Sequence, residues 1–467
     1  MFILKALIAF ANWIWGIPML LVIVGGGFVM SARMGFPQFT RLGFILKHTI
    51  GKSFGEKGKD GQVSGWQAVT GVLASTLGAG NIVGTAMAVA FGGPGGLFWL
   101  WLSALFCSMV KFCEVTMAMK YRRLSPSGKW EGGPQIYLAK ATGWKWTSLA
   151  YAICCGGALF IASSAQIGAG VDNLVGLGTP RIPTTFVLTA LVGVVVIGGI
   201  NSLVKVTEKM VPLMSVIYVV GCLAVIGLNI GHLPEVIGVV FKDAFTGRSA
   251  FGGFAGATIM QSIRWGVARG CYSNDAGNGT TTIVHAAADV NHPVQQGMWG
   301  IFEVFASLVV CTMSSLVVLC TNVWSTGIDP SIMTATAFEQ ALGHLGFLIV
   351  SVSVLLFTFS TACAQVEFTE AQLVALLGDV VRGKARWVML LLILGGGFVG
   401  ISVLIPYIDV FASVNTLINM FGVYYGGSQI VALFKEYFAD PQRWEQEKLG
   451  PWVQMEKEYA EKMQDAK

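Results

Sequence analysis

The chain has 467 residues, of which 54% are hydrophobic and only 12% are charged, and its formal net charge is +5. Soluble domains carry roughly 25% charged residues, so this composition predicts an all-α polytopic membrane protein rather than a set of soluble domains. The basic residues lie beside apolar segments and not along one stripe, which argues against nucleic-acid binding.

The nine cysteines and five histidines do not have the spacing of a metal or redox centre. No Cys-x-x-Cys pair and no His-Glu-x-x-His sequence is present, and the cysteines lie mostly in apolar runs. We therefore expect free buried thiols, no organic cofactor and no enzymatic activity.

Apolar segments along the chain predict eleven membrane spans. A helix needs about 20 apolar residues to cross the hydrocarbon core. The first segment follows Lys5, but its length and the absence of a cleavage site after it indicate a retained helix rather than a signal peptide. The predicted spans are 13–33, 66–91, 95–120, 148–176, 183–200, 210–230, 254–285, 293–322, 342–377, 386–404 and 407–434.

Lysine and arginine concentrate on one side of this arrangement. They fill the loops after the first, third, fifth and ninth spans and the C-terminal tail, while the other side holds only Lys5, Arg181, Lys242 and Arg248. Loops rich in Lys and Arg stay in the cytoplasm. We therefore predict an external N-terminus, a cytoplasmic C-terminus and a location in the plasma membrane, which is the inner membrane in a Gram-negative cell.

Glycine-rich sequences interrupt two of the predicted spans. The first is Leu77-Gly78-Ala79-Gly80-Asn81 in span 66–91, and the second is Asn274-Asp275-Ala276-Gly277-Asn278-Gly279 in span 254–285. Broken helices are tolerated in a membrane mainly where they line a cavity enclosed by protein. Glycine in membrane helices often serves only close packing, and we assign that role to Gly25-Gly26-Gly27 and Gly395-Gly396-Gly397. The amides and the carboxylate at the two breaks instead favour function, because such groups are costly in mid-membrane.

With the first span set aside, the other ten form two sets of five, and each set begins with a broken span. Repeats with an odd number of spans have opposite orientations, which is typical of an inverted-repeat secondary transporter. The charged tail after Phe434 has the composition of a soluble or interfacial helix. The predicted regions are an extra N-terminal helix (1–33), a basic loop (34–65), the first repeat (66–230), the second repeat (231–434) and a cytoplasmic tail (435–467).

A broken helix exposes N–H groups on one half and C=O groups on the other. The N–H end attracts a carboxylate, and the C=O end suits sodium or an ammonium group. A zwitterionic amino acid matches both ends, so Asn81, Asn274, Asp275 and Asn278 become candidate substrate residues.

Other polar residues inside spans allow two interpretations each. The hydroxyls of Ser360 and Thr361 could bind sodium or bond back to their own helix. Gln166 could bind the substrate or join two helices. His285, Glu367 and Glu370 could be gates, proton sites or pocket groups.

Two ionic interactions can also be predicted from spacing. Lys111 and Glu114 lie three residues apart on one helix face, which predicts a structural ion pair. Arg264 and Arg269 precede the second break, where Asp275 or Glu303 would be their partners.

Several motifs resemble the alanine or glycine:cation symporters, also called sodium:alanine symporters. The resemblance covers most of the chain. It rests on Trp15-Gly16-Ile17-Pro18, residues 33–36, residues 77–84, the run 92–101 after the first break, Lys111-Phe112 with Glu114, Gly132-Gly133-Pro134, residues 266–277 and His292-Pro293.

This resemblance implies a leucine-transporter-type fold of five plus five inverted helices with one extra N-terminal helix. It also implies sodium-coupled uptake of a small amino acid. By position, the substrate would lie among Gly78, Gly80, Asn81, Gln166, Asn274 and Gly277. The sodium site would use backbone carbonyls near Ala74 and Leu77 with the hydroxyls of Ser360 and Thr361. The expected partners are therefore the amino acid, the co-transported sodium ion and the lipid bilayer.

The chain departs from the family pattern around this site. Asp275 replaces the usual Glu, Thr280-Thr281-Thr282 and His285 follow the second break, and Gln365 stands where the family usually has Trp. Replacing an indole with an amide enlarges the pocket and makes it more polar, so Gln365 is a candidate substrate residue. Two alternatives stay open: a longer or more polar substrate, and proton coupling through His285, Glu367 or Asp275.

Overall fold

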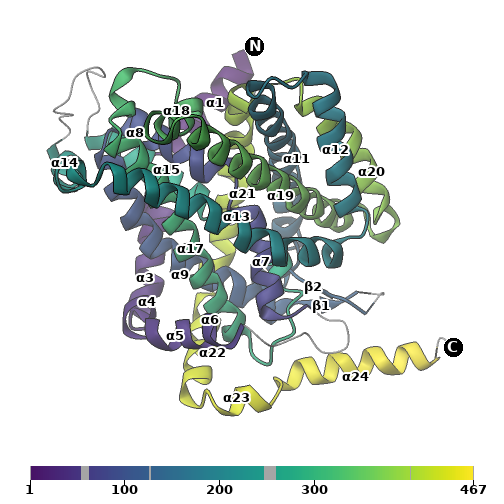
Figure 1. Cartoon of the computed structure of the whole chain (residues 1–467). Helices are drawn as coiled ribbons and strands as arrows, with labels where there is room; N and C mark the ends of the chain where they lie inside the picture. Colours follow the sequence, from purple (N-terminus) through teal and green to yellow (C-terminus); the bar gives the residue numbers. More distant parts are fainter. Residues whose placement is uncertain (1, 54–62, 126–127, 247–258, 400, 466–467) are drawn as a thin grey trace.

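The computed structural model describes residues 2–53, 63–125, 128–246, 259–399 and 401–465, and nearly all of them are helical. The helices pack into one bundle, with the N-terminus at one end and the C-terminal helix lying across the other (Figure 1). Two short strands, β1 (Arg123–Leu124) and β2 (Trp130–Glu131), pair antiparallel near that C-terminal helix.

The N-terminal region contains more helix than the predicted extra span. α1 (Phe2–Ile14) precedes a turn, and the apolar helix Ile17–Arg33 follows as α2 (Ile17–Met19), η1 (Leu20–Gly25) and α3 (Gly26–Arg33). The predicted basic loop begins with α4 (Pro37–Thr40), α5 (Leu42–His48) and α6 (Ile50–Ser53). Lys57 and Lys59 of that loop lie outside the described residues.

The first predicted repeat opens with a helix broken at the expected glycines. Helix α7 (Gly65–Thr76) is followed by η3 (Gly80–Gly84) and α8 (Thr85–Gly92), and the two parts meet at an angle of 57°. The remaining elements of this repeat are α9 (Gly95–Tyr121), α10 (Pro134–Thr142), α11 (Lys145–Gly176), α12 (Arg181–Val196) and α13 (Ile200–Leu228). At the boundary with the second predicted repeat follow η4 (Ile230–His232) and α14 (Leu233–Thr246).

The second predicted repeat differs from the first at its break. Helix α15 (Ile259–Ser273) ends where expected, but only one helical turn, α16 (Thr282–His285), follows it. The start of the predicted span, residues 254–258, lies outside the described residues. The later elements are α17 (Pro293–Cys320), η5 (Val323–Thr326), α18 (Pro330–Leu342), α19 (His344–Leu377), η6 (Asp379–Val381), α20 (Lys384–Gly396), α21 (Ile401–Tyr425), α22 (Gly427–Ala439), α23 (Arg443–Gln446) and α24 (Gly450–Asp465).

Five helices in the described residues are long and apolar enough to cross a membrane, and two bent helix pairs raise that number to seven. The five are α9, α11, α13, α17 and α19. Several other predicted spans correspond to shorter helices, such as α12. The chain is therefore a multi-pass helical protein, and the count of eleven spans stays a prediction.

The boundary between the last two predicted spans was wrong. Helix α21 already begins at Ile401, so Pro406 lies inside it, and the helical direction changes by 57° after Tyr425, where α22 begins. A proline inside a membrane helix removes one backbone hydrogen bond but does not have to end the helix. Apolar composition alone therefore could not place this boundary.

Helix crossings confirm the predicted packing role for Gly27 and Gly396, whereas a Cβ on Gly25 or Gly395, in the same two runs, would meet nothing within 4 Å. A Cβ on Gly27 would lie 2.4 Å from the carbonyl oxygen of Phe106, and one on Gly396 would lie 2.2 Å from that of Ser164. Helices α3 and α9, and helices α11 and α20, therefore approach at backbone distance.

Candidate functional site

A small cavity lies between the two breaks. Its volume is about 70 Å³, and helices α11, α19 and α21 complete its wall. Most of the predicted site residues line it, namely Gly78, Gly80, Asn81, Gln166, Asp275, Asn278, Thr361 and Gln365. The structure therefore brings together residues that lie almost three hundred positions apart in the sequence.

Asn81 holds the first break in shape. Its side-chain oxygen accepts a hydrogen bond from the N–H of Gly78 at 3.1 Å, and its Nδ2 donates to Ser307 Oγ of α17 at 2.9 Å. On the opposite side of the break, Ser273 Oγ contacts the carbonyl oxygen of Gly80 at 3.4 Å. The first break is thus supported from helices α15 and α17.

Four oxygen atoms gather where α7 ends against α19. Ser360 Oγ lies 3.2 Å from the carbonyl oxygen of Ala74, and Thr361 Oγ1 lies 2.9 Å from the same oxygen and 3.4 Å from that of Leu77. These are the four groups that the family resemblance implies for sodium. Ser360 also bonds back to Phe357 of its own helix at 3.0 Å, whereas the hydrogen bonds of Thr361 run to the first break. Carbonyl and hydroxyl oxygens are suitable ligands for a hard cation.

Several buried polar atoms at the cavity have no partner within the described part of the chain. They are Gln166 Oε1, Gln365 Oε1 and both polar atoms of the Asn274 amide. Buried polar groups are normally hydrogen-bonded, so unpaired atoms beside a cavity indicate that a ligand or water completes them. Gln166 and Gln365 line the cavity, while Asn274 lies next to it.

The turn of the second break is shaped by Asp275 and Gly277. Asp275 has a φ of 46° and accepts hydrogen bonds from Asn278 Nδ2 at 3.1 Å and Thr280 Oγ1 at 2.5 Å. Gly277 has a φ of 90°, and a Cβ there would meet Ile23 and Thr416 at 3.1 Å. Gly277 does not line the cavity, so its role is the backbone turn rather than space for a ligand.

Charged side chains meet beneath the second break. Lys111 Nζ lies 3.5 Å from Asp275 Oδ2 and 3.6 Å from Glu303 Oε1. Glu303 also contacts His285 Nε2 at 3.2 Å and accepts a hydrogen bond from Thr76 Oγ1 at 2.6 Å. His285 is therefore a member of a buried ionic network.

The ion pair predicted between Lys111 and Glu114 was therefore wrong. Lys111 pairs with Asp275 and Glu303, and Glu114, its expected partner, accepts a hydrogen bond from Asn419 instead. These contacts join helices far apart in the sequence, which spacing along one helix cannot show.

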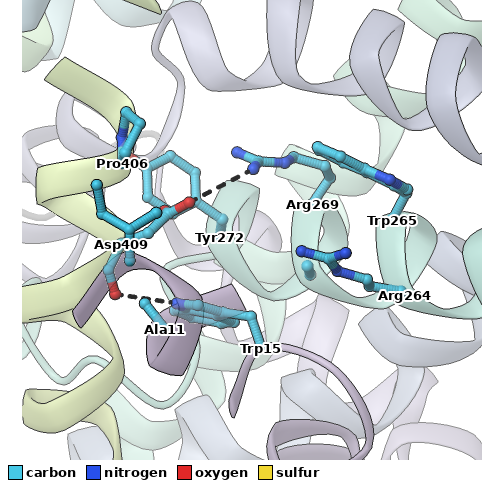
Figure 2. Close-up of a pocket in the computed structure, with 10 residues that line it drawn as sticks. Ala11, Trp15, Arg264, Trp265, Arg269, Tyr272, Pro406 and Asp409 are labelled. Atoms are coloured by element: carbon cyan, nitrogen blue, oxygen red, sulfur yellow. Dashed lines mark hydrogen bonds and ion pairs between the residues drawn. The ribbon is translucent and has the colours of Figure 1, made fainter. Parts of the chain in front are cut away.

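A second cavity of about 190 Å³ adjoins the first, and Tyr272 lines both (Figure 2). In this cavity the guanidinium of Arg269 lies 3.9 Å from the carboxylate of Asp409. Its partner is therefore Asp409, and not Asp275 or Glu303 as predicted. Trp15 Nε1 donates to the backbone oxygen of Asp409 at 3.2 Å, so the N-terminal helices reach this cavity. Asp409 and Tyr272 were not predicted as site residues from the sequence. A lone carboxylate inside the last predicted span was the available signal.

Glu367 and Glu370 line a third cavity of about 380 Å³, bordered by β2 and α20. Arg386 lies 3.3 Å from Glu367 and 2.5 Å from Glu370. These carboxylates are therefore ion-paired across α19 and α20 and do not line the cavity between the breaks.

The family model described as "Sodium:alanine symporter family" matches residues 1–450. An uncharacterized transporter of Bacillus subtilis, YflA, is 35% identical, and the match covers 92% of this chain and 93% of that protein. The sodium/alanine symporter AgcS of Methanococcus maripaludis is 35% identical over 75% of this chain and 78% of that protein. A probable sodium/glutamine symporter of Bacillus subtilis, GlnT, is 27% identical over 93% of this chain and 91% of that protein.

Proposed function

The chain belongs to the sodium:alanine symporter family, and we propose that it imports a small amino acid together with sodium by alternating access. The family makes it a membrane transporter and not an enzyme. The observation that carries the proposal is the position of Thr361, which lines the central cavity and also contacts the carbonyl oxygens of Ala74 and Leu77. Sodium and substrate would therefore bind on either side of one side chain.

The proposed fold is a five-plus-five inverted repeat with one extra N-terminal helix. Under that pairing, α9 corresponds to α17, α11 to α19 and α12 to α20. Each of these pairs packs side by side in the bundle, as do α8 and α15 at the two breaks. Neighbouring equivalents are what a two-fold axis through the bundle centre would produce.

The substrate of the proposal is a zwitterion of about the size of alanine. A water needs roughly 10–15 Å³ of such space, so 70 Å³ accommodates a handful of non-hydrogen atoms. The N–H of Gly80, at the start of η3, would receive the carboxylate, whereas the N–H of Asn81 already donates to the carbonyl oxygen of Gly78 at 3.1 Å. The Oε1 atom of Gln166, which has no partner in the described residues, would accept from the ammonium.

Gln365 supports a second candidate substrate. Its Oε1 lies at the cavity without a partner among the described residues, where it could accept a hydrogen bond from a polar side chain. The relative GlnT is named as a probable sodium/glutamine symporter. A polar amino acid longer than alanine would need the cavity to expand.

A thermal-shift screen of the purified protein against the common amino acids tests substrate and ion together. We expect small amino acids to raise the Tm in sodium buffer and not in potassium buffer. Stabilisation by glutamine but not by alanine would select the second substrate. Equal stabilisation in potassium at neutral pH, with a further gain at acidic pH, would contradict sodium coupling and favour protons through the His285–Glu303 pair.

The proposed orientation places the C-terminal tail in the cytoplasm of the cell. A cysteine at Lys384, the exposed first residue of α20, should be protected from impermeant thiol reagents in intact cells. A cysteine at Gly231, in the exposed turn before α14, should react. The reverse labelling pattern would invert the topology.

A further inference from the structure

Lys111 of α9 is a fully buried lysine whose ammonium lies at the second break. Its Nζ donates to the backbone oxygen of Asp275 at 2.5 Å and to Thr281 Oγ1 at 2.8 Å. Asp275 Oδ2 and Glu303 Oε1 follow at 3.5 and 3.6 Å. The ammonium is therefore surrounded by a carbonyl, a hydroxyl and two carboxylates.

This oxygen set is of the kind that binds a hard cation. Like the four oxygens around Thr361, it includes a backbone carbonyl oxygen at a point where a helix is interrupted. The difference is the occupant. At the second break the positive charge belongs to the protein and is attached to α9.

Three other carbonyl oxygens at the second break also accept hydrogen bonds from side chains of the protein. Ser273 O accepts from Ser307 Oγ at 3.0 Å, Gly277 O from Asn419 Nδ2 at 2.7 Å and Asn278 O from Tyr151 Oη at 2.6 Å. A substrate ammonium or a sodium ion bound there would have to displace these donors. With Asp275 O, four carbonyl oxygens at this break are therefore occupied by side-chain donors.

The carboxylates around Lys111 Nζ require a positive charge at this position. Asp275 and Glu303 are both within ion-pair distance of Lys111, and Glu114 follows one turn later on the same helix. Removing one partner from a buried ionic group leaves uncompensated charge, which is strongly unfavourable. A variant without the lysine amine would therefore recruit a cation from solution or lose the shape of the break.

We propose that Lys111 is a tethered cation that takes the place of a second co-transported ion at the second break. This inference rests on the proposed sodium symport and narrows it, because it leaves a single sodium, at Thr361, for each substrate. Lys111 acts as a positioning residue, since it fixes the break through Asp275 and lies outside the cavity lining.

The test is the sodium dependence of substrate binding in Lys111→Ala, measured by thermal shift on the purified protein. The wild type should show a Hill coefficient for sodium of about one, and the variant a coefficient of about two. Substrate affinity of the variant at low sodium should fall by about tenfold or more. Lys120→Ala is the matched control, because Lys120 lies on the same helix and contacts Gln429 instead of a break. It should keep the wild-type coefficient.

A Hill coefficient of about one in folded Lys111→Ala would overturn the proposal, whatever the uptake rate. If this variant does not fold, the reversal potential of wild-type transport in proteoliposomes decides. A ratio of one sodium to one substrate supports the tethered cation, and two or more sodium ions overturn it. Wild-type transport with no sodium dependence would refute the proposed symport. In that case a monovalent-cation requirement found only in Lys111→Ala would still support the inference, and its absence would overturn it.

Discussion

The two breaks lie on opposite sides of one cavity but are closed by different chemistry. At the first, the carbonyl oxygens of Ala74 and Leu77 face the neutral hydroxyls of Ser360 and Thr361. At the second, the backbone oxygen of Asp275 faces the ammonium of Lys111. A hydroxyl can rotate from donor to ligand when an ion arrives, whereas a tethered ammonium stays in place. The first break is therefore suited to exchange an ion, and the second to remain fixed.

The segments that follow the two breaks differ in the same way: the first is suited to movement and the second to remaining fixed. The first break joins two helical segments across a 57° bend, while the second leads into the single turn α16. Beyond that turn, Arg122 Nη1 donates to the carbonyl oxygens of Ala286 at 3.3 Å and Ala288 at 2.6 Å. Its guanidinium lies between the rings of Trp130 and Trp452, at 4.1 and 4.0 Å. Through Arg122, the tail helix α24 thus helps to fix the chain that follows α16.

The largest expected effect is that of Gly277→Val, which alters the backbone turn of the second break. Valine at a φ of 90° is strained by roughly 1–3 kcal/mol, and its side chain would also press on Ile23 and Thr416. We expect substrate binding to be abolished and the Tm to fall, while the protein still inserts. Gly395→Val is the control, because a Cβ at that exposed helical position meets nothing within 4 Å. A variant that binds substrate normally would show that this turn is not fixed.

Thr361→Ala tests the exchangeable break. It removes one of the two hydroxyls of the proposed sodium site, so the sodium concentration for half-maximal uptake should rise about tenfold. Thr358→Ala is the matched control, since among the described residues that buried hydroxyl bonds to its own helix, to Val354 at 2.9 Å and Leu355 at 3.1 Å. Unchanged sodium activation in Thr361→Ala, with uptake intact, would remove Thr361 from the ion site.

A smaller effect is expected of pH on the stability of the folded protein, because the N-terminal caps of α7 and α17 differ in whether they titrate. Ser64 caps α7 and does not titrate, whereas His292 Nδ1 accepts from Val294 N at 3.2 Å to cap α17. Burial lowers the pKa of His292 from its ordinary 6.5 to about 4. Because the folded state favours the neutral ring, this stability is complete above pH 6.5 and declines as the pH falls toward 4, by up to roughly 3 kcal/mol.

Thermal unfolding between pH 7 and pH 4.5 measures that decline. Glu436, at 4.0 Å from His292 Nε2, is the carboxylate facing the ring, and it can only moderate the effect. His292→Asn keeps a capping oxygen and should flatten the profile. A wild-type Tm that does not fall more than that of His292→Asn would exclude this imidazole as the cause.

The smallest expected effect is a change of selectivity in Gln365→Trp. The indole would reduce the cavity and remove a hydrogen-bond acceptor, so competition should shift by a few-fold toward smaller amino acids. Gln365→Leu separates the two causes, because it removes polarity with little change of volume. An unaltered competition profile in both variants would show that Gln365 does not contact the substrate.

Much of the site follows from the sequence because its signals are local. Glycine with amide and carboxylate groups inside an apolar span marks both breaks, and Gln166, Thr361 and Gln365 do line the cavity between them. The packing glycines Gly27 and Gly396 could also be predicted, because small residues in apolar spans mark close helix contacts. Polar residues at the breaks could be predicted because burying them in a membrane is costly.

The partners of the charged groups could not be predicted from the sequence. Spacing on one helix pointed to Lys111 with Glu114, but Lys111 binds Asp275 and Glu303, and Arg269 pairs with Asp409. Each of these pairs joins separate helices, so it depends on how the helices rotate and slide against one another. The sequence by itself determined which residues must be enclosed by protein. Only the tertiary packing decided which charge neutralises which, and therefore which break carries a cation of its own.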